Sequence, residues 1–208
     1  MVGALRYTVG TMSDVHQLYE KLAADFDKAR GRALFERGYL LEVTSRLEPN
    51  AQVLDFGCGG GEPIARFFVE NGFHVTGVDA APSLLDLCRE RFPQMTWIEH
   101  DMRTLDLGQR FDAILAWNNF FHLRKDDQRA MFAIFEKHAA PSALLLFTSG
   151  PEDSEAIGSL CGQELYHASL DTAEYERLLG EHGFEVLVHR VEDPDCNGHT
   201  VWLAQRRF

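Results

Sequence analysis

Apolar side chains recur along this chain at two different spacings. In residues 14–30 and 33–47 they stand three or four positions apart, which is the spacing of one face of a helix. From residue 51 onward, short runs of consecutive apolar residues alternate with segments of helical spacing. Such runs are typical of strands that are buried on both faces of a sheet. The pattern therefore predicts two N-terminal helices, followed by strands and helices in alternation.

Strands separated by helices indicate a parallel sheet with helices on both of its faces. The predicted strands of this alternating part are 51–56, 73–79, 95–101, 110–117 and 143–149, and the predicted helices are 63–72, 82–92 and 125–139. A further helix is expected at 171–183, before two last strands. The link between those strands, PDCNG at 194–198, is short and rich in turn residues, which predicts an antiparallel hairpin.

Residues 150–170 break this rhythm, because they are polar and contain several glycines. We expect a long loop or lid there, over residues 149–170. With 208 residues, of which 45% are hydrophobic, the chain can bury one substantial core but hardly two. The predicted organisation is an N-terminal helical cap, residues 1–48, on a single core domain, residues 49–208.

Charge and cysteine usage narrow the expected partners. The net charge of −12, with no basic patch along the chain, argues against nucleic acid. The four cysteines lie apart without metal-ligand spacing, which fits free thiols in a reducing cytosol and predicts no metal site. No apolar run approaches the roughly 20 residues of a membrane span, and residues 1–14 do not resemble a signal peptide. We therefore expect a cytoplasmic protein without a membrane partner.

The stretch VLDFGCGGGE, residues 53–62, has four glycines between a predicted strand and a predicted helix. Nucleotides bind at such a position, because the following helix offers free N–H groups there. A phosphate-binding P-loop would need a Lys and a Ser or Thr after the glycines, and neither follows. A dinucleotide fingerprint starting at Gly57 would need glycine at position 62, which is Glu62. The pattern present is D-x-G-x-G-x-G, from Asp55 to Gly61.

In this form the stretch resembles the first motif of the class I S-adenosylmethionine-dependent methyltransferases. Further family positions follow in order, with Asp79 and Asp101 at the ends of the second and third predicted strands and FDAILAW as the fourth-strand motif. The resemblance covers roughly residues 49–208. It implies a Rossmann-like α/β fold, in which a mostly parallel seven-stranded sheet has its last strand antiparallel and helices cover both faces.

The resemblance also implies S-adenosyl-L-methionine as the cofactor and a set of residues that bind it. Asp79 would accept both ribose hydroxyls, Asp101 would meet the adenine amino group, and Met102 would pack on the adenine ring. The full expected set is Asp55, Gly57, Cys58, Gly59, Asp79, Ala80, Asp101, Met102 and Trp117. The N-terminal helices would be the family's variable cap, with Tyr19 and Phe26 on the cofactor side. The structural alternative is that Asp79 and Asp101 only cap helices or turns.

Methyl transfer requires an in-line nucleophile and a water-free site, and a base only where the acceptor must lose a proton early. Candidate bases lie where the strands end at their carboxyl side. They are His122, Tyr166, His167 and His199. Each of them could instead have a purely structural role, such as a hydrogen bond to the main chain.

These observations favour a methyltransferase that acts on a small molecule, as a monomer or a homodimer. The acceptor atom, whether N, O, C or S, stays open because the fold and cofactor motifs are shared across acceptors. One alternative is a module that binds S-adenosylmethionine or S-adenosylhomocysteine without transferring a methyl group. Another is a nicotinamide-dependent oxidoreductase, which the absence of a third fingerprint glycine disfavours.

Overall fold

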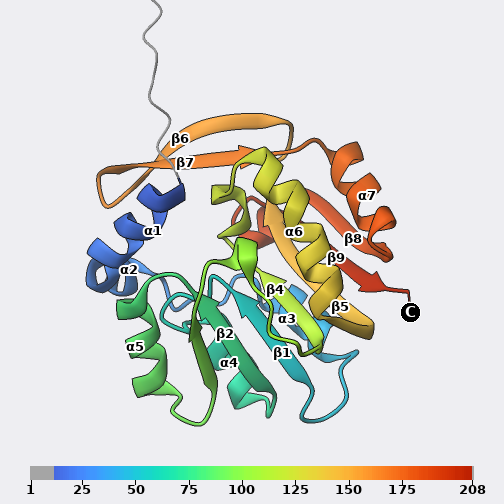
Figure 1. Ribbon diagram of the computed structural model, residues 1–208, viewed down its shortest axis with the longest axis horizontal. Coiled ribbons are helices and arrows are strands. Elements are labelled where there is room, and N and C mark those ends of the chain that lie inside the picture. Colours follow the sequence, from blue (N-terminus) through green and yellow to red (C-terminus); the bar gives the residue numbers. More distant parts are fainter. Residues whose placement is uncertain (1–11, 208) are drawn as a thin grey trace, which may run out of the picture.

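The computed structural model describes residues 12–207, with side chains from residue 15 onward. A twisted sheet forms its centre, and helices lie on both sides of the sheet (Figure 1). The strands are β1 (Gln52–Phe56), β2 (His74–Asp79), β3 (Thr96–Glu99), β4 (Phe111–Ala116), β5 (Ala139–Ser149), β6 (Ser154–Leu160), β7 (Gln163–Ser169), β8 (Phe184–Asp193) and β9 (His199–Arg206). The α-helices are α1 (Met12–Lys21), α2 (Ala23–Ala29), α3 (Arg37–Thr44), α4 (Ile64–Glu70), α5 (Pro82–Arg91), α6 (Lys125–His138) and α7 (Thr172–Glu181). Single 3₁₀ turns are η1 (Met102–Thr104), η2 (Phe120–His122) and η3 (Pro194–Cys196).

Seven strands form the main sheet in the order β3-β2-β1-β4-β5-β9-β8. The strands β1 to β5 run parallel, whereas β9 is antiparallel to both of its neighbours, β5 and β8. The expected fold class, including the reversed last strand, is confirmed.

The buried strands divide their side chains between two cores, because successive residues of a strand point to opposite faces of the sheet. Leu54 of β1 packs with α6 and α7 residues in one core. Its neighbour Val53 packs with residues of α3, α4 and α5 in the other core. Both faces of the sheet are therefore covered, which explains why these strands are continuously apolar in the sequence.

Of the two alternatives expected over residues 149–170, the long loop is wrong, since β6 and β7 form an antiparallel hairpin there, and the lid stays a prediction. Its two-residue turn, Cys161 and Gly162, has positive φ at both positions, 49° and 79°. Such a turn matches the twist of a two-stranded ribbon. Most side chains of β6 are exposed on both faces of the hairpin. The strand therefore lacks the apolar alternation by which strands are recognised.

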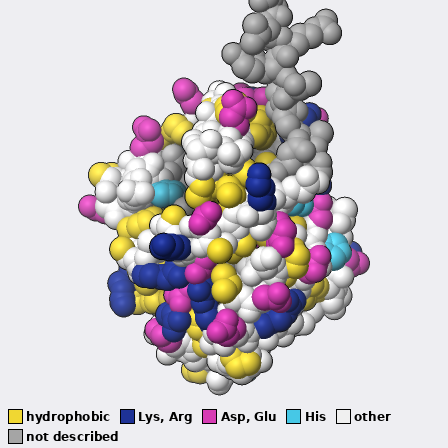
Figure 2. Space-filling model, turned by 90° about the vertical axis from the view of Figure 1, so that its left-hand side faces the viewer, with side chains coloured by type: hydrophobic (Ala, Val, Ile, Leu, Met, Phe, Trp, Pro, Cys, Tyr) yellow, Lys and Arg dark blue, Asp and Glu magenta, His cyan; other side chains and the backbone are white. Residues whose placement is uncertain are grey.

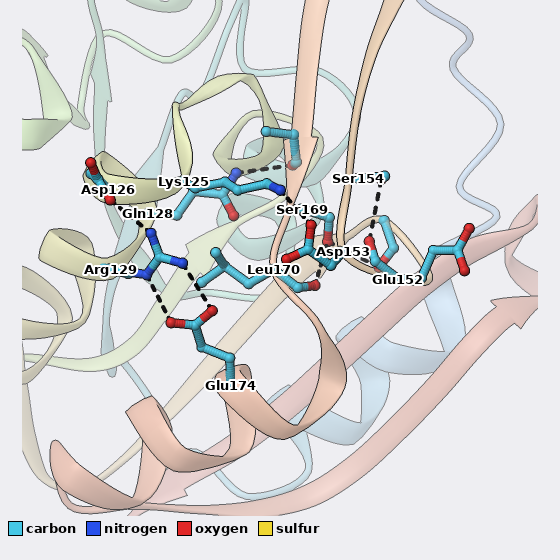
Figure 3. Close-up of polar contacts among 12 residues, drawn as sticks. Lys125, Asp126, Gln128, Arg129, Glu152, Asp153, Ser154, Ser169, Leu170 and Glu174 are labelled. Carbon is cyan, nitrogen blue, oxygen red and sulfur yellow. Dashed lines mark hydrogen bonds and ion pairs between the residues drawn. The ribbon is translucent and has the colours of Figure 1, made fainter.

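One buried side chain, Gln128 of α6, anchors the hairpin to the core (Figure 3). Its amide nitrogen donates to the carbonyl oxygens of Leu123 and Ala168, both at 2.9 Å. Its amide oxygen accepts from the Tyr175 hydroxyl at 2.6 Å. Arg129, one residue along, binds both carboxylate oxygens of Glu174 and so joins α6 to α7. The position of β7 over the core is thus set by a fully satisfied polar group.

The N-terminal part contains three short helices where two were predicted. The first predicted helix breaks at Leu22, so that α1 and α2 can both pack against α5. Glu20 of α1 accepts from the main-chain N–H of Ser83 at 3.0 Å, at the start of α5. The predicted helix at 33–47 is shortened to α3. Residues 1–11 of the proposed cap, 1–48, lie outside the described residues.

A second link holds α2 in place. Arg91 of α5 binds both carboxylate oxygens of Asp27, at 2.8 and 2.6 Å, and also donates to the carbonyl oxygen of Gly60 at 2.8 Å. This side of the molecule otherwise carries basic and acidic side chains intermingled, without a large area of one sign (Figure 2). No helix within residues 12–207 is long and apolar enough to cross a membrane.

We expect Arg91→Ala to detach α2 from α5 and from the glycine loop. The free energy of unfolding should fall by about 1–2 kcal/mol, because shielded hydrogen bonds to charged groups are worth about that much. Arg46→Ala is the matched control, since its pair with Glu42 is exposed on both sides, at 41% and 43%, and should cost less than about 1 kcal/mol. Urea unfolding of both variants measures the difference. Equal losses would show that the Asp27 link does not hold the cap.

Candidate active site

A cavity lies at the carboxyl ends of β1, β2 and β4, and residues of α1 and α2 close it from the other side. The cavity and its mouth hold about 1010 Å³ of empty space. Ligand crevices of open parallel sheets occur at this end, where the chain crosses from one side of the first strand to the other. Most of the expected cofactor residues line this cavity: Asp55, Gly57, Cys58, Gly59, Asp79, Ala80, Met102 and Trp117.

The glycines after β1 allow the main chain to turn tightly beside the cavity. Gly57, Gly59 and Gly61 have φ of 59°, 54° and 76°, a conformation that other residues adopt at a cost. A Cβ atom on Gly57 would lie 2.7 Å from the side chain of Asn119. The loop can therefore approach a ligand with bare main chain.

Asp79, at the end of β2, is bound to this loop. Its carboxylate accepts from the main-chain N–H groups of Gly59 and Ala81, each at 2.9 Å. Burial raises the pKa of Asp79, and the N–H groups oppose that rise. The second acid, Asp55, is only 4% exposed, and burial together with the nearby Asp79 raises its pKa to about 8. Two carboxyl groups that line one cavity, Asp55 buried and Asp79 half-buried, favour a ligand that carries positive charge.

Two polar atoms on the β4 side of the cavity lack a hydrogen-bond partner within the described part of the chain. They are Nε1 of Trp117, a donor, and Oδ1 of Asn119, an acceptor. The amide nitrogen of Asn119 is already used, since it donates to the carbonyl oxygen of Trp117 at 3.0 Å. Buried polar atoms are usually paired, so these two are available to a ligand.

His122 lines the cavity and is 6% exposed. Its Nδ1 lies 3.0 Å from the main-chain carbonyl oxygen of Tyr166, and its Nε2 lies 3.2 Å from the hydroxyl oxygen of Tyr19. Burial lowers the pKa of His122 to about 4, so the ring is neutral at neutral pH. Burial first, and then the charge of Asp79, raises the pKa of Tyr19. Both side chains are therefore uncharged partners of one hydrogen bond at the cavity wall.

Comparison with known sequences and solved structures finds methyltransferases in each case. A family model described as a methyltransferase domain matches residues 53–142. In solved structures the fold recurs in the S-adenosylmethionine-bound amino pentose methyltransferase CalS10 of Micromonospora echinaspora, with a TM-score of 0.69, 22% identity and 91% and 97% of the two chains covered. It also recurs in the 1,6-didemethyltoxoflavin-N1-methyltransferase of Burkholderia thailandensis, with a TM-score of 0.75, 19% identity and 100% and 94% covered.

The chain matches a methyltransferase domain over residues 53–142 and has the fold of S-adenosylmethionine-dependent methyltransferases. A curated relative in Saccharopolyspora spinosa, dTDP-4-amino-2,3,4,6-tetradeoxy-D-glucose N,N-dimethyltransferase, is 28% identical over 64% of this chain and 57% of its own length. A second, dTDP-3-amino-3,4,6-trideoxy-alpha-D-glucopyranose N,N-dimethyltransferase of Streptomyces venezuelae, is 28% identical over 50% and 44%. The chain thus spans about half the length of these curated relatives.

The expected cofactor of this methyltransferase, S-adenosyl-L-methionine, is confirmed at the level of the family, and the residues present fit it. The positive-φ glycines form a bare main-chain cradle, and the acids Asp55 and Asp79 suit a ligand with positive charge and no phosphate. The unpaired atoms of Trp117 and Asn119 offer a donor and an acceptor to its polar groups.

One expected cofactor residue of the methyltransferase, Asp101, does not line the cavity. Its carboxylate accepts from the main-chain N–H of Arg103 at 3.0 Å and from the guanidinium of the same residue. It caps η1, which is the structural alternative left open for it. Although burial opposes the shift, the bonds from Arg103 lower the pKa of Asp101. Contact between Asp101 and adenine stays a prediction.

Of the four candidate bases of the methyltransferase, only His122 lines the cavity. Tyr166 contributes its main-chain carbonyl to His122, while its own side chain lies in the hairpin. The ring of His167 lies behind His122, with ring centres 4.8 Å apart. His199 stacks on Trp117 at 5.8 Å and bonds the carbonyl oxygen of Cys196 through Nδ1 at 2.7 Å. The structure thus places Tyr166 and His167 next to His122, and His199 outside the cavity lining, against Trp117.

Several residues that line the cavity are not identified from the sequence. These residues come from the N-terminal helices and from the segment after β3. They are His16, Asp27, Arg30 and His100. The first three share the helical spacing of Tyr19 and Phe26. The cofactor-side positions expected for Tyr19 and Phe26 were the available signal, because polar residues at helical spacing from these two share their face.

We expect Asp79→Ala to weaken binding of S-adenosylhomocysteine by more than tenfold. The substitution removes the acceptor proposed for the ribose hydroxyls and releases the N–H of Gly59. Asp106→Ala is the control, because Asp106 is exposed, lies outside the cavity lining, and bonds only Lys137 and the main-chain N–H of Gly108 within the described residues. Titration calorimetry gives both affinities. An unchanged affinity for Asp79→Ala would place the ribose elsewhere.

The raised pKa of Asp55 predicts a pH effect on stability. Because its folded-state pKa of about 8 exceeds the usual value of about 3.9, its contribution to stability is complete at low pH and is lost as the pH rises through about 8. Asp55→Asn should therefore raise the melting temperature of the ligand-free protein at pH 9, relative to wild type, and have less effect at pH 6. Calorimetric melting at both pH values measures this. A constant difference would exclude titration of Asp55 in that range.

Proposed function

We propose that this protein transfers the methyl group of S-adenosylmethionine to the amino nitrogen of a small-molecule acceptor. One observation carries the proposal: a single cavity combines the glycine cradle and Asp79 with the neutral Tyr19–His122 pair. The first two suit the cofactor, and the pair offers polar contacts to an acceptor without a base that is poised near neutral pH. The cofactor, when bound, supplies a methyl group that is already activated for displacement.

The lining residues divide into groups for the parts of the cofactor. Asp79 receives the ribose hydroxyls, and Met102 packs on the adenine. Trp117, Asn119 and Arg30 receive the amino-acid part, because Arg30 is a cation suited to a carboxylate and Oδ1 of Asn119 can accept from an ammonium group. Burial and the charge of Asp79 raise the pKa of both Asp55 and Tyr19, and the charge of Arg30 opposes this rise, which supports its place near the methyl donor.

A nitrogen acceptor fits the site better than an aliphatic hydroxyl does. A hydroxyl needs a base to remove its proton as the new bond forms, whereas a neutral amine attacks first and loses a proton afterwards. His122, with a pKa of about 4 and both ring nitrogens engaged, is a poor base at neutral pH. Asp55 lies at the end of β1 beside the cofactor cradle, where it would face the cofactor itself. The names of the four relatives described above include three amino-sugar methyltransferases, in agreement with this choice.

The two alternatives make different demands on the same cavity. A module that only binds the cofactor would need no access for an acceptor, yet Tyr19 and His122 reach the cavity beside the cradle. A nicotinamide oxidoreductase would bring a pyrophosphate to the loop, where the three acids Asp55, Glu62 and Asp79 line the cavity. We propose further that the protein acts in the cytoplasm, as a monomer or homodimer, without nucleic acid or membrane partners.

The test is a methylation assay with matched acceptors. Purified protein is incubated with S-adenosylmethionine and either an amino sugar, the same sugar with a hydroxyl in place of the amine, or a cell extract. Release of S-adenosylhomocysteine is measured, and mass spectrometry locates the methyl group. We expect release with the amino compounds, and methylated nitrogen as the product.

Three other outcomes would contradict the proposal. Faster turnover of the hydroxyl sugar would assign oxygen as the acceptor atom. Tight binding of S-adenosylhomocysteine, with no release in any reaction, would favour a binding module. Binding of NADH in calorimetry, without a response to S-adenosylhomocysteine, would favour an oxidoreductase.

A further inference from the structure

We propose that His122 and the main-chain carbonyl of Tyr166 fix the direction of the hydrogen bond of Tyr19, so that the Tyr19 oxygen meets the acceptor amine only as a hydrogen-bond acceptor. In this arrangement Tyr19 touches the nucleophile, and His122 is a positioning residue rather than a base. The inference rests on the proposed function, because it concerns the amine that this function requires.

The main-chain carbonyl of Tyr166 determines which ring nitrogen of His122 carries the proton. A carbonyl oxygen can only accept a hydrogen bond, so the ring nitrogen 3.0 Å from it, Nδ1 of His122, must carry the proton. A neutral imidazole has one N–H, which leaves Nε2 with a lone pair. The ring stays neutral at neutral pH because burial lowers the pKa of His122 to about 4.

The tautomer of His122 in turn fixes the direction of its hydrogen bond with Tyr19. Nε2 of His122 lies 3.2 Å from the hydroxyl oxygen of Tyr19, and it can only accept. The Tyr19 O–H therefore donates to His122, and the lone pairs of its oxygen remain. Tyr19 lines the cavity, and its ring packs edge-on against Phe26 with ring centres 5.1 Å apart. The phenol is thus held in place, and its oxygen can offer a ligand only an acceptor.

This polarity matters for an amine nucleophile. A free phenol O–H would donate to the amine lone pair, which is the electron pair that must form the new bond. An oxygen that only accepts binds an amine N–H instead and leaves the lone pair free to face the methyl group. In the reaction the nitrogen pair forms the N–C bond, the C–S bond breaks, and its electron pair stays on sulfur. The nitrogen becomes positive, which strengthens its N–H bond to Tyr19, and the proton leaves to water after transfer.

The β6–β7 hairpin holds the Tyr166 carbonyl, the first member of this chain of hydrogen bonds, in place. Tyr166 belongs to β7, which Gln128 ties to the core through the carbonyl of Ala168, two residues further on (Figure 3). His167 packs on the His122 ring from the same strand. The segment that looks like a polar loop in the sequence therefore determines the hydrogen-bond direction at the cavity wall.

The first experiment reads the direction without any acceptor. In protein labelled with ¹⁵N-histidine, long-range ¹H–¹⁵N spectra distinguish the two neutral tautomers, and His122→Gln identifies the signals. At pH 7 we expect Nδ1 of His122 to be protonated and Nε2 to be a lone-pair nitrogen whose shift changes in Tyr19→Phe. Protonation at Nε2, or no response to Tyr19→Phe, would overturn the inference.

The second experiment tests its consequence with the amino sugar that the methylation assay uses. Tyr19→Phe should lower kcat about tenfold through loss of one hydrogen bond in the transition state, and His122→Leu should lower it further, because the Tyr19 O–H is then free to bind the amine. Adding Tyr19→Phe to His122→Leu should raise kcat again. His122→Gln, whose amide can accept from Tyr19 and donate to Tyr166, should retain most of the activity.

A merely structural role for His122 predicts that the double variant is no faster than His122→Leu, and that result would overturn the inference. If His122→Leu does not fold by circular dichroism, the comparison of His122→Gln with Tyr19→Phe and the tautomer spectra decide. If the amine is methylated but His122 is protonated at Nε2, only the inferred hydrogen-bond direction is contradicted. The expected tautomer with no methylation of any amine contradicts the proposed function and leaves the direction of the hydrogen bond established.

Discussion

The hydrogen bond from the main-chain N–H of Gly59 to the carboxylate of Asp79 is the contact on which the site depends. It joins the loop after β1 to the end of β2, and both partners are otherwise unfavourable: a glycine loop loses much entropy on ordering, and a half-buried carboxylate loses part of its hydration. Each offsets the cost of the other. Gly77 of β2 contributes nearby, because any Cβ there would lie 2.3 Å from the ring of Trp97. The same Cβ would lie 2.8 Å from the sulfur of Cys58, so the absence of a side chain at Gly77 lets this residue of the glycine loop lie against β2.

From this contact the cavity is completed by segments far away in the sequence. The cap contributes Tyr19 and is held through α5 by Glu20 and Asp27. The hairpin contributes only a main-chain oxygen, that of Tyr166. His122, between them, has both ring nitrogens engaged by these two insertions. A sheet shared by many enzymes thus acquires a particular polarity from segments outside the sheet, which agrees with the view that function resides in sites added to a common fold.

The strands of the parallel part of the sheet and the glycine loop after the first of them could be predicted from the sequence, because their signals are local. Buried strands are continuous apolar runs, and Asp55, Asp79 and the glycines follow such runs directly. The β6–β7 hairpin could not, since its exposed strand has no apolar period and its two-residue turn begins with a cysteine at positive φ. The role of Tyr166 could not be predicted either, because its side chain suggested a phenol whereas the structure uses its carbonyl. For Asp101 the sequence position agreed with the family motif, but the position alone could not show that Arg103, two residues later, binds its carboxylate.

The acidic side chains that line the cavity differ in whether they form ion pairs. Of the acids that line it, Asp27 and Glu62 are paired with arginines, whereas Asp55 and Asp79 have no ion pair within residues 15–207. Burial, and then repulsion by Asp79, raises the pKa of Asp55 to about 8, so this carboxyl group holds a proton at neutral pH. A cation entering beside them releases that proton and recovers the interaction energy, while a phosphate would meet two acids and lose its own hydration. In the proposed function these two carboxyl groups favour the positively charged methyl donor, and the uncharged Tyr19–His122 pair distinguishes acceptors by hydrogen-bond direction instead of charge.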